Sequence, residues 1–254
     1  MANSNPAQDF ERAHLLDKID LVAERLDAHY GPRLLEPNND PVIEIVSTIL
    51  SQHTSDINSG RAYASLKAAF PTWEEVIDAP TPLLAESIRS GGLAGQKAPR
   101  IQAVLEAILE QEGDFDLSFL GTMSVADARA WLTRINGIGP KTASCVLLFS
   151  LGMPAMPVDT HVHRVSLRLG IMPPGMNADA GHVWLESLLG PDADRIFAFH
   201  VEMIRHGREV CIARNPRCSD CFLADICDYA NALPPDTLTA GNTRRRKQGR
   251  TDQQ

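Results

Sequence analysis

The chain has 254 residues, 44% of them hydrophobic, and a formal net charge of −8 at pH 7. That length and apolar content are enough for one large domain or two smaller ones with a buried core. No segment approaches the roughly 18 uninterrupted apolar residues of a membrane span, and the start, MANSNPAQDFERAHLL, lacks the basic and then apolar order of a secretory signal. We therefore expect a cytoplasmic protein without a membrane partner.

Helical periodicity dominates the chain, and no segment alternates convincingly between apolar and polar residues as a strand does. The segment PVIEIVSTILSQ has the pattern of a buried helix. The helices that this spacing predicts along the chain cover residues 10–29, 41–52, 97–112 and 180–190. The fold class that follows is all-α.

Capping residues mark the starts of two further helices. Thr72 is followed three residues later by Glu75, which is the pattern of a capping box. Ser124 is followed at the same spacing by Asp127, ahead of the periodic segment VADARAWLTRI. Both pairs predict a helix that begins immediately after the capping residue.

Two glycines and a proline interrupt the next stretch, INGIGPKTASCVLLFSLG, at residues 135–152. We expect Gly137 and Gly139 to take the positive φ angles of a tight turn. Pro140 suits the first position of a second helix, which should end at Gly152. The result is a helix–hairpin–helix, whose backbone N–H groups beside a helix N-terminus favour a phosphate group.

Lys141 falls in the first turn of that second helix. The positive end of the helix dipole disfavours an ammonium group there, so we expect the pKa of Lys141 to be lowered. A neutral amine is a nucleophile, whereas an ammonium is not. A lysine that only contacts phosphate is the alternative that this turn leaves open.

Asp159 precedes a short helical segment that ends at Gly170. Its position predicts a helix N-cap. A capping carboxylate is also held in a fixed place, so it is suited to deprotonate a nucleophile or to stabilise positive charge on a sugar. The structural and the catalytic role are compatible.

Four of the five cysteines lie close together, with the spacing C-x6-C-x2-C-x5-C. Four thiolates this near in sequence indicate a soft metal centre rather than disulfides in a cytosolic chain. Spacing alone leaves two metals open, because four thiolates suit both zinc and an iron–sulfur cluster. The cysteines are Cys211, Cys218, Cys221 and Cys227.

The negative total charge is unevenly distributed along the chain. Between Arg134 and Arg168 the fully charged side chains sum to +3, and between Arg205 and Arg217 four arginines face one glutamate. Binding to nucleic acid depends on where positive groups lie rather than on the total. The net charge therefore does not exclude a nucleic-acid partner.

The segments GIGPKTA and PVDTHVHRV, followed by the cysteine run, resemble the endonuclease III family of helix–hairpin–helix DNA glycosylases over residues of about 15–230. The resemblance implies that Lys141 attacks C1′ of a damaged nucleoside, expels the base and forms a Schiff base, after which β-elimination nicks the strand. It implies that Asp159 assists the lysine and the sugar, and that the four cysteines hold one [4Fe–4S] cluster. The expected partner is double-stranded DNA with a damaged base or an abasic site, bound by a monomer that would be nucleoid-associated in a bacterium.

The family also suggests which residues contact DNA. Polar groups at the end of one helix and a leucine on a glycine-rich loop are expected to fill the gap left by an extruded base. The hairpin glycines and nearby arginines are expected to contact the backbone. The expected DNA-contact residues are Gln52, His53, Leu93, Gly137, Gly139, Arg164, Arg214 and Arg217.

The resemblance implies two domains. A six-helix barrel is expected over 39–152, and a domain with the iron–sulfur cluster over 1–38 and 153–230. Residues 231–254 are polar and basic and are expected to form a disordered tail. The alternative is that this tail binds phosphate groups as a non-specific arm.

Departures from the common family pattern affect the choice of substrate. Asn136 stands where the family usually has proline, and the glutamine of SQHTSD lies one position away from its usual place in the family. Both features favour the branch that contains the plant 5-methylcytosine glycosylases, whose large flanking regions this chain lacks. Oxidised pyrimidines remain the expected substrate. The alternatives are a monofunctional glycosylase with water activated by Asp159, and a non-catalytic iron–sulfur protein that binds DNA.

Overall fold

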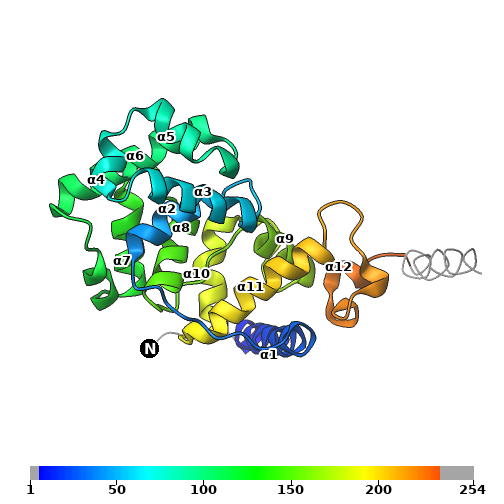
Figure 1. Cartoon of the computed structure of the whole chain (residues 1–254). Helices are drawn as coiled ribbons and strands as arrows, with labels where there is room; N and C mark the ends of the chain where they lie inside the picture. Colours follow the sequence, from blue (N-terminus) through cyan, green and yellow to red (C-terminus); the bar gives the residue numbers. More distant parts are fainter. Residues whose placement is uncertain (1–5, 235–254) are drawn as a thin grey trace, which may run out of the picture. The chain divides into compact units, whose positions relative to one another are not determined.

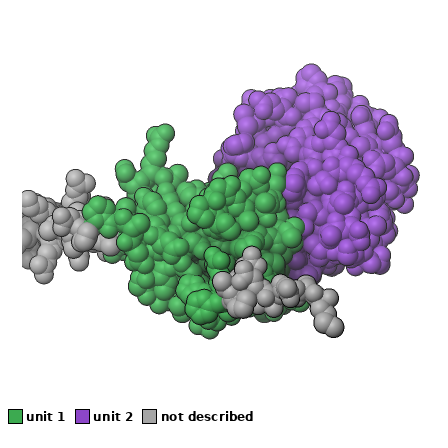
Figure 2. Space-filling model, turned by 180° about the vertical axis from the view of Figure 1, so that it is seen from behind, with its two compact units in different colours: residues 1–34, 158–254 green, residues 35–157 purple. Residues whose placement is uncertain are grey.

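The computed structural model describes residues 6–234 and divides the chain into two compact units, residues 35–157 and residues 1–34 with 158–254 (Figure 2). The described residues form helices and connecting turns without a β-strand, which confirms the all-α prediction. None of the described helices is long and apolar enough to cross a membrane. Most of the expected tail, residues 235–254, lies outside the described part of the chain.

The unit of residues 35–157 is built from seven α-helices and three shorter turns (Figure 1). The α-helices are α2 (Pro41–Ser51), α3 (Asp56–Ala69), α4 (Trp73–Asp78), α5 (Thr81–Ser87), α6 (Ala94–Glu112), α7 (Val125–Arg134) and α8 (Pro140–Cys145). The shorter turns are η1 (Arg89–Gly91), η2 (Ser118–Thr122) and the π-helical η3 (Val146–Ser150), which continues α8.

Helix α2 lies at the centre of this unit and packs against α3, α6, α8 and η3. It is apolar on most of its surface, as the sequence predicted for a buried helix. The large aliphatic side chains of α2 that are fully buried are Val42, Ile45, Val46, Ile49 and Leu50. Full burial of one such side chain contributes about 1.5–3 kcal/mol to folding.

The helix starts follow the capping residues. The hydroxyl of Thr72 accepts a hydrogen bond from the Glu75 N–H at 3.2 Å, and the Glu75 side chain accepts one from the Thr72 N–H at 3.0 Å. Ser124 Oγ accepts from the Asp127 N–H at 3.1 Å. Both capping predictions are confirmed, so these starts are encoded locally.

The second unit contains α1 (Pro6–Tyr30), α9 (Thr160–Leu169), α10 (Ala178–Leu189), α11 (Ala193–Glu209) and α12 (Asp228–Asn231), with the short turns η4 (Cys218–Asp220) and η5 (Ala224–Ile226). Helix α11 packs against α9 and α1. A Cβ atom at Gly207 would lie 2.9 Å from Cβ of His161, so a glycine is needed where α11 meets α9. This close approach brings the C-terminal end of α11 beside α9, where the cysteine segment begins.

Candidate functional site

The turn between α7 and α8 is a tight hairpin. Gly137 has φ of +101°, and a Cβ atom there would lie 3.0 Å from Val104, so both its conformation and its surroundings require glycine. Gly139 has φ of −91°, so the expectation of a positive φ at this position is wrong. A Cβ atom on Gly139 would meet nothing within 4 Å. The fold therefore does not require glycine at position 139.

Lys141 occupies the first turn of α8, directly after Pro140 at the first helical position, as predicted. Its side chain is half-buried. The helix continues through the π-helical turn Val146–Ser150 and ends before Gly152, whose φ is +62°. Single π-helical turns within α-helices are frequent at functional sites.

Arg100 on α6 supports the hairpin, and sequence analysis missed it. Its Nε donates to the carbonyl of Gly137 at 2.9 Å, and Nη1 donates to Oε1 of Gln52 at 2.8 Å. Gln52 caps the end of α2. One guanidinium therefore joins the hairpin to a residue predicted to contact DNA.

Lys97, one turn earlier on α6, is buried. Its ammonium donates to the carbonyls of Leu50 and Gly91, both at 2.7 Å. Burial lowers the pKa of Lys97. Lys97 thus fixes the end of α2 and the turn before Leu93 to the same helix.

Leu93 and His53 both have left-handed backbone conformations, with φ of +51° and +54°. This conformation costs a non-glycine residue about 1–2 kcal/mol. Leu93 is also 48% exposed, so neither local preference nor core packing explains an apolar side chain there. Backbone strain held by surrounding structure is common at functional sites.

Asp159 is the N-cap of α9, as predicted. Its Oδ1 accepts hydrogen bonds from the N–H groups of His161 and Val162, at 2.8 and 2.7 Å. Both bonds use the same oxygen, so the carboxylate is oriented while Oδ2 takes part in neither. The residue is half-buried.

The four clustered cysteines line one pocket, together with Arg168, His206 and Tyr229. Burial, opposed by the Leu223 N–H and reinforced by the neighbouring thiols, raises the pKa of Cys221 to about 11. Burial and neighbouring thiols also raise the pKa values of Cys218 and Cys227. Four thiolates at this place therefore need a compensating cationic centre, and the donor set fits an iron–sulfur cluster.

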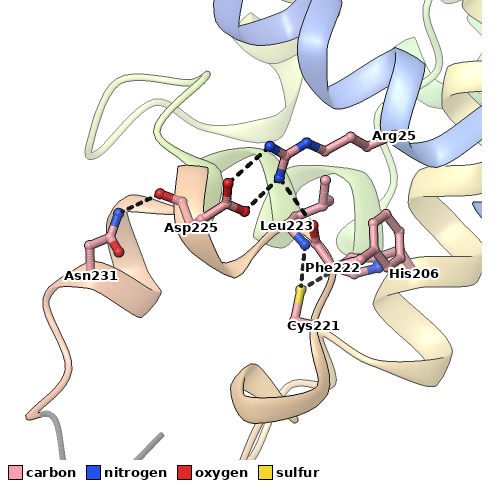
Figure 3. A network of polar contacts seen from close by, with 7 residues as sticks. All are labelled: Arg25, His206, Cys221, Phe222, Leu223, Asp225 and Asn231. Atoms are coloured by element: carbon pink, nitrogen blue, oxygen red, sulfur yellow. Dashed lines mark hydrogen bonds and ion pairs between the residues drawn. The ribbon is translucent and has the colours of Figure 1, made fainter.

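N–H groups point at two of the sulfurs. The Leu223 N–H donates to Cys221 Sγ at 3.4 Å (Figure 3), and Arg168 Nη1 donates to Cys211 Sγ at 3.3 Å. Hydrogen bonds of this kind stabilise thiolate ligands and tune a cluster's potential. The His206 ring lies against the same Cys221, with Nε2 at 3.6 Å from the sulfur.

Helix α1 is tied to the cysteine segment by Arg25 (Figure 3). Its two terminal nitrogens contact the two carboxylate oxygens of Asp225 at 2.5 and 2.9 Å, and Nη1 also donates to the carbonyl of Phe222 at 3.2 Å. A forked contact of this kind fixes geometry better than a single ion pair. The N-terminal helix therefore helps to shape the cysteine pocket.

The arginines expected to contact DNA have different surroundings. Arg214 and Arg217 are exposed between the first two cysteines. Arg164 is half-buried, and it donates to the carbonyls of Cys211 and Gly207 at 3.1 and 2.9 Å. Its guanidinium supports the start of the cysteine segment from within, so the structure does not favour Arg164 as a surface contact.

Comparison with known proteins agrees with this geometry. Residues 46–180 match the HhH-GPD superfamily base excision DNA repair proteins, and residues 211–227 match the iron-sulfur binding domain of endonuclease III. Endonuclease III of Thermotoga maritima is 33% identical over 194 residues, which are 75% of this chain and 84% of that protein. A relative from Arabidopsis thaliana is 36% identical over 204 residues, which are 80% of this chain and 66% of that one.

A solved structure of a trapped covalent intermediate between endonuclease III and DNA has a TM-score of 0.70 at 28% identity, covering 85% of this chain and 97% of that one. The chain belongs to the endonuclease III family of HhH-GPD base excision DNA repair proteins. It is a DNA glycosylase of a family in which AP lyase activity is typical, and its cofactor is a [4Fe–4S] cluster.

Proposed function

We propose that Lys141 is the nucleophile of a bifunctional glycosylase and AP lyase. Its amine attacks C1′ of the damaged nucleotide, the base leaves, and the resulting Schiff base permits β-elimination and strand cleavage. The observation that carries the proposal is the placement of Lys141 in the first turn of α8, directly behind the Gly137 hairpin. The covalent DNA intermediate trapped for a structural neighbour supports the same chemistry.

Asp159 is the second catalytic residue in this proposal. Its carboxylate is oriented by two backbone N–H groups through Oδ1. A fixed negative charge stabilises the positive charge that develops on the sugar as the base departs. Because the cap already fixes the carboxylate, little reorganisation is needed during the reaction.

The four cysteines, Cys211, Cys218, Cys221 and Cys227, are proposed as the cluster ligands. When bound, the cluster supplies four iron–thiolate bonds that tie this segment together. Arg214 and Arg217 lie exposed between the first two ligands, where they are suited to contact DNA phosphates. The role proposed for the cofactor is thus to stiffen a DNA-binding loop.

Gln52, His53 and Leu93 are proposed to occupy the space of an extruded base. Support comes from the strained, exposed conformation of Leu93 and from Lys97, which holds the ends of both segments through two carbonyls. A rigid wedge reduces the cost of keeping a base out of the stack. Gly137 and Gly139 are proposed to let the DNA backbone approach the hairpin.

The proposed substrate is double-stranded DNA with an oxidised pyrimidine or an abasic site, bound by a monomer. Chromosomal DNA as substrate would place the protein in the cytoplasm, at the nucleoid in a bacterium. The proposed division of labour gives the hairpin to the barrel of residues 39–152 and the cluster to residues 1–38 with 153–230.

Borohydride trapping on an abasic-site duplex tests the nucleophile. Wild-type protein should form a covalent adduct, Lys141→Gln should form none, and Asp159→Asn should form it slowly. Absence of an adduct with folded, cluster-loaded wild-type protein would overturn the lyase. A panel of duplexes with thymine glycol, dihydrouracil, uracil or 5-methylcytosine, with base release and nicking scored separately, tests the substrate class.

A further inference from the structure

The side-chain amide of Gln52 is held in one orientation by Arg100 on α6. Arg100 Nη1 donates to Gln52 Oε1 at 2.8 Å. A guanidinium group has only N–H donors and no acceptor, so the amide must turn its oxygen, rather than its NH2 group, toward Arg100. Rotating the amide by half a turn would set two donors against each other and lose a charge-assisted hydrogen bond. The contact therefore fixes which end of the amide faces away from Arg100.

The Arg100 guanidinium is fixed by the hairpin as well. Its Nε donates to the carbonyl of Gly137 at 2.9 Å, and Nη2 donates to the same carbonyl. The side chain also packs on this turn, because a Cβ atom built on Gly137 would lie 3.4 Å from Cγ of Arg100. One planar, half-buried group therefore holds both the Gln52 amide and the hairpin that precedes Lys141.

The backbone that carries Gln52 is also held in place. The Gln52 N–H donates to the carbonyl of Ile49 at 3.4 Å, at the end of α2. The buried ammonium of Lys97 donates to the carbonyl of Leu50 at 2.7 Å, two residues before Gln52. Rotation within the side chain is therefore the main freedom left to Gln52, and the bond to Arg100 removes it.

The NH2 group of Gln52 is the part of the amide that is left for a ligand. Among the residues that the structure describes, no hydrogen-bond partner lies against Nε2. A free side-chain amide offers both an acceptor and donors, so it can adapt to either kind of group on a base. Because Oε1 is turned toward Arg100, the other end of the Gln52 amide offers donors alone.

We propose that Arg100 is a positioning residue that makes Gln52 recognise the orphan base, which is the base opposite the lesion, through an acceptor atom of that base. This inference rests on the proposed place of Gln52 in the gap left by the extruded base. The orphan base has lost its Watson–Crick partner, so its acceptors need new donors. Adenine, the orphan base opposite a thymine-derived lesion, offers the ring acceptors N1, N3 and N7 and one donor group, its amine.

Binding to adenine analogues tests this recognition without the chemical step. Each duplex carries tetrahydrofuran, an abasic-site analogue that cannot form a Schiff base, opposite adenine, purine, or 1-, 3- or 7-deazaadenine. Purine lacks only the amine, whereas each deazaadenine lacks one ring acceptor. Cluster-loaded, full-length wild-type protein should bind the adenine and purine duplexes with affinities within about twofold of each other, and should lose about 3–10-fold in affinity with one of the deazaadenines.

Variants at both residues should change these affinity ratios. Arg100→Met frees the amide to rotate, so the loss with the deazaadenine should shrink to less than about twofold. Arg89→Met, at an exposed arginine of the same unit, removes a positive charge as a control and should keep the wild-type ratios. Gln52→Glu keeps an oxygen for Arg100 and replaces the NH2 group by an acceptor. This variant should tolerate the deazaadenines and prefer adenine to purine, and it decides the question if Arg100→Met fails to fold by circular dichroism.

Three outcomes overturn the inference alone: wild-type protein that binds adenine and every deazaadenine equally, wild-type protein that loses most affinity with purine, or wild-type ratios in Arg100→Met or Gln52→Glu. A different result is a Gln52→Leu variant that binds every duplex as tightly as wild type. It overturns the proposed place of Gln52 in the gap, and the role of Arg100 with it.

Discussion

Replacing Lys97 by methionine should weaken the fold and loosen the segment that carries Leu93. The methionine retains the buried apolar stem but removes two hydrogen bonds of 2.7 Å, to the carbonyls of Leu50 and Gly91. Each buried acceptor left without a donor costs about 1–3 kcal/mol. Part of this loss is offset because burial already disfavours the ammonium, as its lowered pKa shows. We expect a net loss of about 2–3 kcal/mol in the free energy of unfolding.

Urea denaturation followed by circular dichroism measures this loss. With a slope of about 2 kcal/mol per molar urea, the midpoint should fall by about 1–1.5 M. Arg61→Met, at an exposed arginine of the same unit, is the control and should shift the midpoint by less than about 0.3 M. Equal shifts for the two variants would refute the assignment of Lys97 as a buried clamp. Binding to a duplex with an abasic site should weaken only in Lys97→Met.

Further variants test the hairpin, the wedge and a buried carboxyl. Gly137→Ala should lose at least about 1 kcal/mol of stability in urea titrations, whereas Gly139→Ala should unfold like wild type and lose affinity for DNA in a gel-shift assay. Leu93→Gly should relieve the left-handed strain and gain up to about 1 kcal/mol in stability, yet release damaged bases more slowly; unchanged base release would contradict a wedge. Glu202 on α11 is buried, and burial together with Asp27 raises its pKa to about 8. Between pH ~4.3, the pKa of a glutamate in the unfolded chain, and about pH 8, Glu202 is protonated in the native state but ionised in the unfolded state. The contribution of Glu202 to stability should therefore fall by about 2 kcal/mol from pH 5.5 to 7. In urea titrations at pH 5.5 and 7, Glu202→Gln should not show this loss of stability. An equal loss in wild type and Glu202→Gln would contradict the prediction.

Features encoded by a few neighbouring residues could be predicted from the sequence. The Thr72–Glu75 capping box, the start of α8 at Pro140 and the cap at Asp159 all depend on contacts within three residues, and each was predicted correctly. The apolar pattern of α2 likewise identified a buried helix. Local propensity and periodicity are sufficient for such elements.

Residues that act through distant partners could not be found in this way. Arg100 bonds to a residue 48 positions away, and Lys97 to one 47 positions away. The prediction of a positive φ angle at Gly139 was wrong for a related reason. A glycine in the sequence permits a positive φ without requiring one.

The most direct test of the account is to map the borohydride-reduced crosslink between cluster-loaded wild-type protein and an abasic-site duplex. After nuclease and protease digestion, mass spectrometry should find the sugar remnant on the Nζ atom of Lys141. A remnant on another lysine or on the N-terminal amine would contradict the assignment of Lys141 as the nucleophile.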